Sequence, residues 1–181
     1  MKEFSLDKAK AENALLYIAG KIQSNNVADK YKLLKILYFA ERKHLAMYGR
    51  PITGDSYVKM KFGPVPSYCY DLIKPTNKKN SLYSISKTEI KVTKLPDLDY
   101  LSESDIECLN LAIEENMGLN FIGIKDKSHD SLHIEMKQES VLSFIDMAKA
   151  EGANDEMISY IKLLSENQNF TFNAPLSNKS K

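Results

Sequence analysis

The sequence predicts an α+β fold that is predominantly α-helical: a single compact helical domain with a small β-hairpin. Three observations lead to this prediction. The chain of 181 residues has about the length of one domain. Apolar residues recur at helical spacing along most of it, between residues that start and stop helices. One segment, residues 82–95, is instead rich in residues that favour strands.

Composition and chain organisation narrow the class of protein further. With 43% hydrophobic and 27% charged residues, the chain is neither a disordered nor a membrane protein, and no apolar run approaches the roughly 20 residues of a spanning helix. We expect residues 1–172 to form one domain and residues 173–181 a polar, disordered tail. The N-terminus resembles no signal or transit peptide, which predicts a cytoplasmic protein. Cys69 and Cys108 form no CxxC motif and are expected to be buried free thiols.

The first two predicted helices carry clear boundary signals. Ser5 is the expected N-cap of a first helix, which ends before the SNN sequence at residues 24–26. Asp29 is the expected N-cap of a longer second helix that ends at Gly49. Apolar residues cover most of the circumference of this second helix in its middle turns. We therefore expect it to be central and packed on several sides.

The glycine- and proline-rich segment RPITGDSYVKMKFGPVPSYCYDLIKP predicts two short helices that meet at a tight corner. Asp55 or Ser56 would cap the first of them, which would end at Gly63. Pro64 and Pro66 suit the beginning of the second, because proline is tolerated in the first turn of a helix.

Beyond a polar TNKKN loop, the sequence predicts a hairpin and then more helices. The hairpin strands are expected at residues 82–86 and 89–95. Ser102 and Asp105 form the pattern of a capping box in front of a helix that would end near Gly118. The remaining helices are expected to start at Asn120 and to span residues 140–150 and 154–167.

The net charge of +1 hides a strong asymmetry along the chain. Residues 1–94 hold 18 lysines and arginines and 8 acidic residues, whereas residues 95–181 hold 7 and 16. If the two halves pack together, ion pairs between them would consume this asymmetry, which is the interpretation we favour. Otherwise a basic face would attract an acidic protein or a nucleic acid.

The motifs of the common enzyme classes are absent from the sequence. It contains no GxSxG, GxxxxGK[ST] or GxGxxG pattern. His129 and His133 have the spacing of metal ligands, but they lack the glutamate of a zincin helix, so we expect neither a metal nor a cofactor. His44 on the long helix is expected either to lie on the helix surface or to be a hydrogen-bonded core residue. The less favoured alternative is a polar group that holds a neighbouring loop or a partner. An enzyme would require Tyr38, His44 and Asp55 to converge in one pocket.

Tyrosines alternate with lysines between residues 57 and 74, a pattern that could serve base stacking beside phosphate contacts. Tyrosine is equally at home in a core or a protein interface, and we favour that interpretation. Exposed aromatic side chains make good interface anchors. The candidates for contact with a partner are Tyr68, Tyr83, Phe170 and Phe172.

The stretch KLLKILYFAERKHLAMYGRPITGDSYVKMKFGPVPSYCYD resembles the Panacea domain, also called the SocA-like antitoxin domain. The resemblance is strongest over residues 30–71 and extends more weakly over about residues 10–135. This sequence departs from the family in having no tryptophan after its Ser-His pair. The matching motif positions are Tyr38, Phe39, His44, Gly49, Asp55, Gly63, Pro64, Val65, Ser128 and His129.

The resemblance implies an antitoxin that binds a cognate protein toxin directly, either blocking it or delivering it to a cytosolic protease. It implies a mainly structural role for the motif residues and no catalytic site. The contact surface is expected on the variable hairpin and the last two helices. A nucleic-acid-binding regulator that uses the basic first half is the alternative, and an enzyme is the less favoured third.

Overall fold

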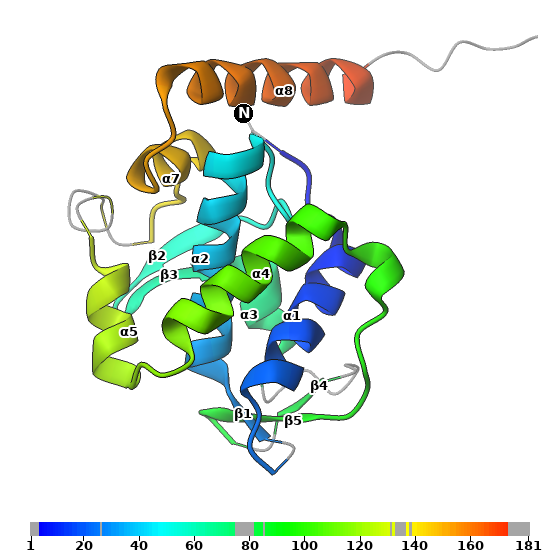
Figure 1. Cartoon of the computed structure of the whole chain (residues 1–181), viewed down its shortest axis with the longest axis vertical. Coiled ribbons are helices and arrows are strands. Elements are labelled where there is room, and N and C mark those ends of the chain that lie inside the picture. The colour runs from blue at the N-terminus through cyan, green and yellow to red at the C-terminus, as the bar shows by residue number, and fades with distance from the viewer. Residues whose placement is uncertain are drawn as a thin grey trace, which may run out of the picture.

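A computed structural model describes residues 4–25, 27–74, 82–84, 86–130, 132, 137 and 139–173. As predicted, the described chain is mostly helical, with small antiparallel sheets (Figure 1). The described helices are α1 (Lys8–Ile22), α2 (Lys30–Tyr48), α3 (Ser67–Leu72), α4 (Glu103–Asn116), α5 (Phe121–Ser128), α7 (Phe144–Ala150) and α8 (Asp155–Asn173), with a short 3-10 turn at Leu98–Tyr100. The described strands are β1 (Val27–Asp29), β2 (Tyr57–Met60), β3 (Gly63–Pro66), β4 (Leu82–Ser84) and β5 (Glu89–Val92).

Helix α2 is the centre of the fold, as its sequence predicts. The Asp29 side chain accepts a hydrogen bond from the main-chain N–H of Lys32 at its start, and Gly49 ends it with a φ of 70°. Almost every residue from Leu33 to Leu45 is buried, because α1, α4, α5, α7 and β3 all pack against the helix. Polar and charged side chains within this stretch are therefore also buried, and each needs a partner.

Helices α1 and α4 flank α2. The predicted N-cap of α1 is wrong, and the predicted N-cap of α4 is confirmed. Asp7, not Ser5, caps α1, because its carboxylate accepts from the N–H of Lys10 at 3.0 Å. The predicted capping box of α4 is present: Ser102 accepts from the N–H of Asp105, whose side chain accepts from the N–H of Ser102.

Of the two helices predicted between residues 55 and 75, the first is wrong and the second is confirmed. Residues 57–66 form a β-hairpin, with Tyr57 opposite Pro66 and Met60 opposite Gly63; only the second predicted helix exists, as α3. The other edge of β2 is also paired, since the N–H of Lys59 donates to the Ser140 main-chain oxygen at 2.9 Å. Pairing with a distant segment favours the strand, and no local pattern reveals it.

Asp55 does cap a helix, but not the predicted one. Its two carboxylate oxygens accept from the main-chain N–H groups of Tyr68 and Cys69, each at 3.0 Å. Asp55 therefore caps α3 from the far side of the β2–β3 hairpin. This contact fixes the hairpin against the helix that follows it.

The predicted hairpin of the middle segment is confirmed, with shorter strands. Strands β4 and β5 pair antiparallel, and β1 adds a third strand on the other side of β5, in the order β1-β5-β4. Strand β1 was not predicted, because its three residues form part of the link between two helices. The sheet lies at the start of α2, at the bottom of Figure 1.

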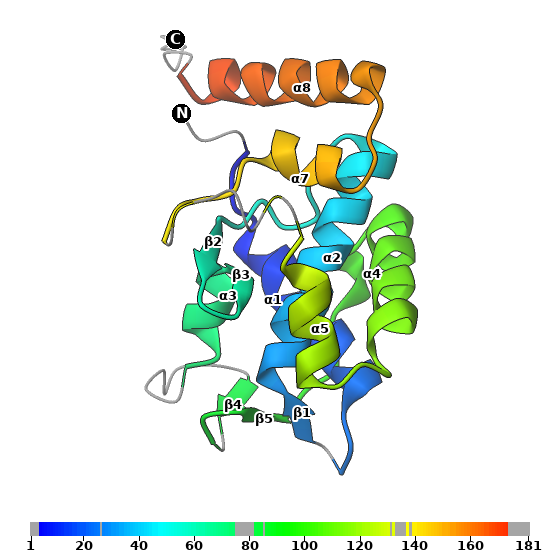
Figure 2. The same cartoon turned by 90° about the vertical axis from the view of Figure 1, so that its left-hand side faces the viewer.

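Helices α7 and α8 form a layer at the opposite end of α2, where α8 lies across the top of the molecule in both views (Figures 1 and 2). Gly49 makes this contact possible, since a Cβ atom there would lie 2.4 Å from the Tyr160 ring. Helix α8 runs to Asn173, six residues beyond its predicted end, so the backbone of Phe170 and Phe172 is helical. Among the described helices, none is both long and apolar enough to cross a membrane.

Candidate functional site

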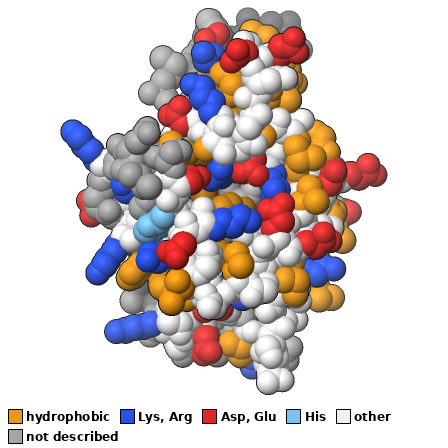
Figure 3. Space-filling view, turned by 60° about the vertical axis from the view of Figure 1, so that its left-hand side comes forward, with side chains coloured by type: hydrophobic (Ala, Val, Ile, Leu, Met, Phe, Trp, Pro, Cys, Tyr) orange, Lys and Arg blue, Asp and Glu red, His pale blue; other side chains and the backbone are white. Residues whose placement is uncertain are grey.

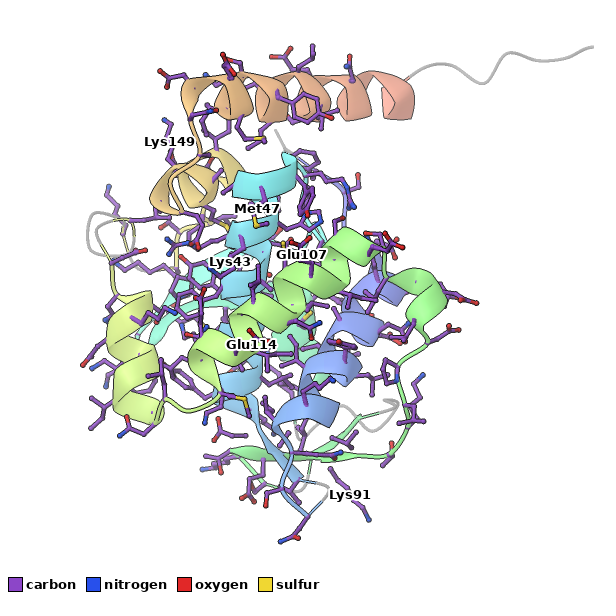
Figure 4. All side chains as sticks on the ribbon, viewed as in Figure 1. Lys43, Met47, Lys91, Glu107, Glu114 and Lys149 are labelled. Carbon is purple, nitrogen blue, oxygen red and sulfur yellow. The ribbon has the colours of Figure 1, made fainter. Side chains whose placement is uncertain are left out.

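The C-terminal half of α2 holds cations that pair with carboxylates from the second half of the chain. Arg42 is 5% exposed and contacts Asp130 at 2.5 Å and Glu151 at 3.0 Å. Its guanidinium also donates to the Ala150 main-chain oxygen at 2.6 Å. Neighbouring Lys43 bridges Glu151 at 3.1 Å and Glu115 at 2.7 Å. In Figure 4 Lys43 lies where α4 crosses α2.

Asp105 is the acidic centre of a second buried network. His44 Nδ1 donates to the Arg50 main-chain oxygen at 2.7 Å, and its Nε2 lies 3.2 Å from Asp105 Oδ1. Lys10 Nζ is 2.6 Å from the other oxygen of Asp105. Burial alone would raise the pKa of Asp105, but hydrogen bonds from His44, Lys10 and Ser102 outweigh it and hold that pKa below its usual range.

These contacts answer two questions left by the sequence. The predicted pairing between the basic and acidic halves is confirmed for Lys10, Arg42, Lys43 and Arg50, all of which bind carboxylates beyond residue 94. His44 is a hydrogen-bonded core residue, which is one of the two placements expected, and it also holds the neighbouring loop through the Arg50 main-chain oxygen. These four cations are therefore engaged in contacts within the fold.

The motif residues of the N-terminal half of α2 meet at the turn between β2 and β3. Lys35 is fully buried, and its Nζ donates to the Pro64 main-chain oxygen at 2.7 Å. Burial lowers the pKa of Lys35 to about 7. A Cβ atom on Gly63, whose φ is +95°, would lie 2.5 Å from both Lys35 Nζ and Ser128 Oγ, with His129 at 3.2 Å. Only glycine fits this junction without displacing a neighbour.

An open groove of about 450 Å³ lies beside this junction. It runs between the start of α2, the β2–β3 hairpin, α3, the β4–β5 turn and the start of α5. Its lining is predominantly apolar and includes Tyr31, Leu34, Met60, Val65 and Ile73. Size and lining are those of a binding site for apolar groups.

Three aromatic rings form one wall of the groove. Tyr31 and Phe121 stack with their centres 4.5 Å apart, and Phe62 meets Phe121 edge-on at 5.6 Å. The Tyr31 hydroxyl donates to the main-chain oxygen of Phe62. Phe62 and Phe121 are nevertheless 45% and 48% exposed. The wall is thus fixed in place but still open to a partner.

Lysines surround the groove. The described residues that line it include exposed Lys61, Lys74 and Lys87 and no carboxylate. Lys30 also lines it, but its side chain is buried and its Nζ donates to the Ser86 main-chain oxygen. Lys74 pairs with exposed Asp71 outside the groove, and no described carboxylate forms an ion pair with Lys61 or Lys87. Figure 3 shows apolar side chains at the lower left of this side of the molecule, with basic side chains projecting beside them. We call this feature the lysine-rimmed groove.

The structure distributes the predicted motif residues among separate structural contacts. Tyr38 packs against Phe39 and Tyr57 in the core, and none of Tyr38, His44 and Asp55 lines the groove. Gly63 and Val65 line the groove, and Pro64 accepts the Lys35 hydrogen bond beneath it. The three polar residues that an enzyme would need in one pocket thus make three different structural contacts.

The remaining candidates are spread over the molecule. The Tyr68 hydroxyl donates to Glu12 at 3.0 Å, away from the groove, whereas Tyr70 lines it. The side chains of Tyr83, Phe170 and Phe172 and all of His133 lie outside the described residues. Cys69 and Cys108 are buried free thiols, as predicted. Among the described residues, no cluster of His, Cys, Asp or Glu could hold a metal ion.

Sequence reasoning missed the residues that distinguish the groove. Phe62 lies in the β2–β3 turn, Lys87 in the β4–β5 turn and Phe121 at the start of α5, and nothing local marks them as neighbours. The alternation of tyrosines and lysines between residues 57 and 74 contains three other groove residues, Lys61, Tyr70 and Lys74. It is the sequence signal that came nearest to the groove.

Comparison with known families gives one result. No curated protein and no solved structure matches the chain. The model of the Panacea domain, of SocA-like antitoxins, matches residues 33–132, more than half of the 181 residues. The matched region begins in α2 and ends just after the Ser128–His129 pair. It contains the buried junction and the described residues that line the groove, except Lys30 and Tyr31. The chain therefore belongs to the Panacea domain family, the SocA-like antitoxins.

Proposed function

We propose that this protein is an antitoxin that neutralises a cognate protein toxin by direct, stoichiometric binding. Membership of the SocA-like antitoxin family carries the proposal. The geometry supports binding over catalysis, because the buried polar groups at the motif positions are used in structural contacts. An open groove with exposed aromatic residues supplies a surface on which a protein can dock.

Co-expression with the product of the neighbouring gene tests the proposal. The neighbour alone should arrest growth, and addition of this chain should restore growth and yield a co-purifying complex. A neighbour that arrests growth in the presence of the folded chain, with no complex, would contradict direct neutralisation. The destabilised variant Asp105→Asn serves as a control, because rescue should fall with the amount of folded protein.

Toxin abundance separates the two modes of neutralisation. Under simple blocking, the toxin should persist at unchanged levels in rescued cells, bound to this chain. Under delivery to a cytosolic protease, its level should fall when this chain is present and recover when the protease is removed. Quantitative immunoblotting of a tagged toxin distinguishes these outcomes.

A further inference from the structure

We infer that the lysine-rimmed groove is the docking site for an acidic segment of the partner protein that also carries apolar side chains. This inference rests on the proposed function and names the surface through which the chain would bind its partner. It replaces the expectation that the last two helices form the contact, since the groove lies at the opposite end of α2 from α7 and α8 (Figure 2).

The floor of the groove calls for apolar anchors on the partner. Leu34, Met60, Val65 and Ile73 give it an aliphatic surface. A volume of about 450 Å³ lies within the usual range of ligand pockets and accommodates a few side chains of leucine or phenylalanine size. Apolar side chains that enter such a groove leave water, which is the main source of binding free energy.

The rim calls for negative charge on the same partner segment. Lys61, Lys74 and Lys87 line the groove with exposed side chains, and no carboxylate is among the described lining residues. At Arg42 and Lys43, by contrast, the cations pair with carboxylates of the chain itself. An acidic segment would therefore find complementary charge at this place, which speeds association and sets the orientation of the bound chain.

The groove is also preformed. Gly63 holds the hairpin turn against Lys35 and Ser128, and the stacked rings of Tyr31 and Phe121 fix the adjoining wall. A surface that is rigid before binding loses little conformational entropy when a partner docks.

The lining favours a peptide over a nucleic acid as the occupant. The exposed rings of Phe62 and Phe121 suit stacked bases as well as apolar side chains. The choice therefore rests on the aliphatic floor and on the absence of arginine among the described lining residues, since arginine often contacts nucleic acids. The two possibilities are separable by experiment, because nucleic-acid binding weakens steeply with salt.

The test uses the full-length protein and three fluorescently labelled probes. The first is a short peptide that repeats the sequence Glu-Leu-Asp-Phe, the second is its charge-reversed counterpart Lys-Leu-Lys-Phe, and the third is a single-stranded oligothymidine. Binding is followed by fluorescence anisotropy at low and at physiological salt. The acidic peptide should bind and the other two should not.

A matched pair of variants locates the binding. The double variant Lys61→Glu, Lys87→Glu should weaken binding of the acidic peptide at least about tenfold, because two attractive charges become repulsive. The control Lys149→Glu, Lys162→Glu makes the same charge change on α7 and α8 and should leave affinity within about twofold (Figure 4 labels Lys149). Circular dichroism verifies that both variants fold.

Every outcome decides for or against the inference. An acidic peptide that binds no better than the charge-reversed one, or equal losses in the two double variants, would overturn it, as would preferential binding of oligothymidine. If the acidic peptide fails this test but the chain still rescues growth from the toxin, the groove is not the docking site and the proposed function stands. If the acidic peptide binds specifically but the chain rescues growth from no toxin, the groove is a binding site and the proposed antitoxin function is wrong.

Discussion

The two ends of α2 use their positive charges in opposite ways. Towards its C-terminus, Arg42 and Lys43 contact carboxylates contributed by the acidic second half of the chain. Towards its N-terminus, Lys32 and Lys35 donate to the main-chain oxygens of Met117 and Pro64, and the lysine-rimmed groove opens beside them. One helix thus carries buried ion pairs at one end, whereas the groove at its other end exposes Lys61 and Lys87, which pair with no described carboxylate.

This contrast separates residues that hold the fold together from residues available for binding. A buried cation paired with a carboxylate of its own chain has lost its water, and removing either partner leaves a charge buried alone. A rim lysine remains solvated and adds little to stability, but it raises the local potential that an acidic partner meets. Each prediction below perturbs one of these two regions.

The largest effect is expected at Asp105. Asp105→Asn should lower the free energy of unfolding by about 3 kcal/mol or more, because Lys10 and buried His44 lose their charged partner. Urea unfolding measures this loss. Glu114→Gln, at an exposed position of the same helix, is the control and should change stability by less than about 0.5 kcal/mol. A similar small change in both variants would show that the network does not support the fold.

The same carboxylate predicts acid sensitivity. Its pKa in the folded protein lies below the ordinary value, so its stabilising contribution is complete above about pH 4 and is lost as the pH falls below that. Asp105→Asn should therefore be less sensitive than the wild type to acidification below this pH.

The next largest effect on stability is expected at Gly63, in the junction beneath the groove. Gly63→Ala is expected to lower the free energy of unfolding by about 1–3 kcal/mol, since its φ is +95° and the new Cβ meets Lys35 and Ser128. Gly20→Ala provides the opposite control, because Gly20 is helical and nothing lies within 4 Å of an added Cβ. That variant should gain up to about 1 kcal/mol. Thermal unfolding compares the two, and equal responses would show that Gly63 is not under steric constraint.

Lys35 predicts a dependence of stability on alkaline pH. Burial lowers its pKa to about 7 in the folded protein, so between that value and its unfolded pKa of about 10.4 the unfolded state binds more protons. Its contribution to stability therefore rises with pH in this window. Relative to Lys35→Met, the wild type should gain up to about 1 kcal/mol per pH unit from about pH 7 to 8.5. Urea unfolding at several pH values measures this difference, which parallel curves would contradict.

The smallest effect on stability is expected at the groove rim. Lys61→Gln and Lys87→Gln together should change the free energy of unfolding by less than about 0.5 kcal/mol, because no described carboxylate pairs with either lysine. Affinity for the acidic peptide should nevertheless fall severalfold. A large loss of stability in this variant would show that the rim lysines belong to the architecture, and the contrast between the two ends of α2 would disappear.

Local sequence signals determined most of the helical architecture. Helix boundaries could be predicted from the sequence, because caps act within three or four residues. The examples are the start of α2 at Asp29, its end at Gly49 and the capping box of Ser102. Asp55 shows the limit of such reasoning. Its residue type correctly indicated a helix cap, but the helix that it caps begins twelve residues later, across a hairpin.

The sequence by itself determined a mostly helical fold with a central second helix, membership of the Panacea family, and an uneven distribution of charge. Only the tertiary structure decided which charges neutralise one another and which remain at the surface. It also brought Phe62, Lys87 and Phe121 together at one groove. The physical reason is range: capping and periodicity are local, whereas ion pairs and grooves depend on contacts between segments that only folding brings together.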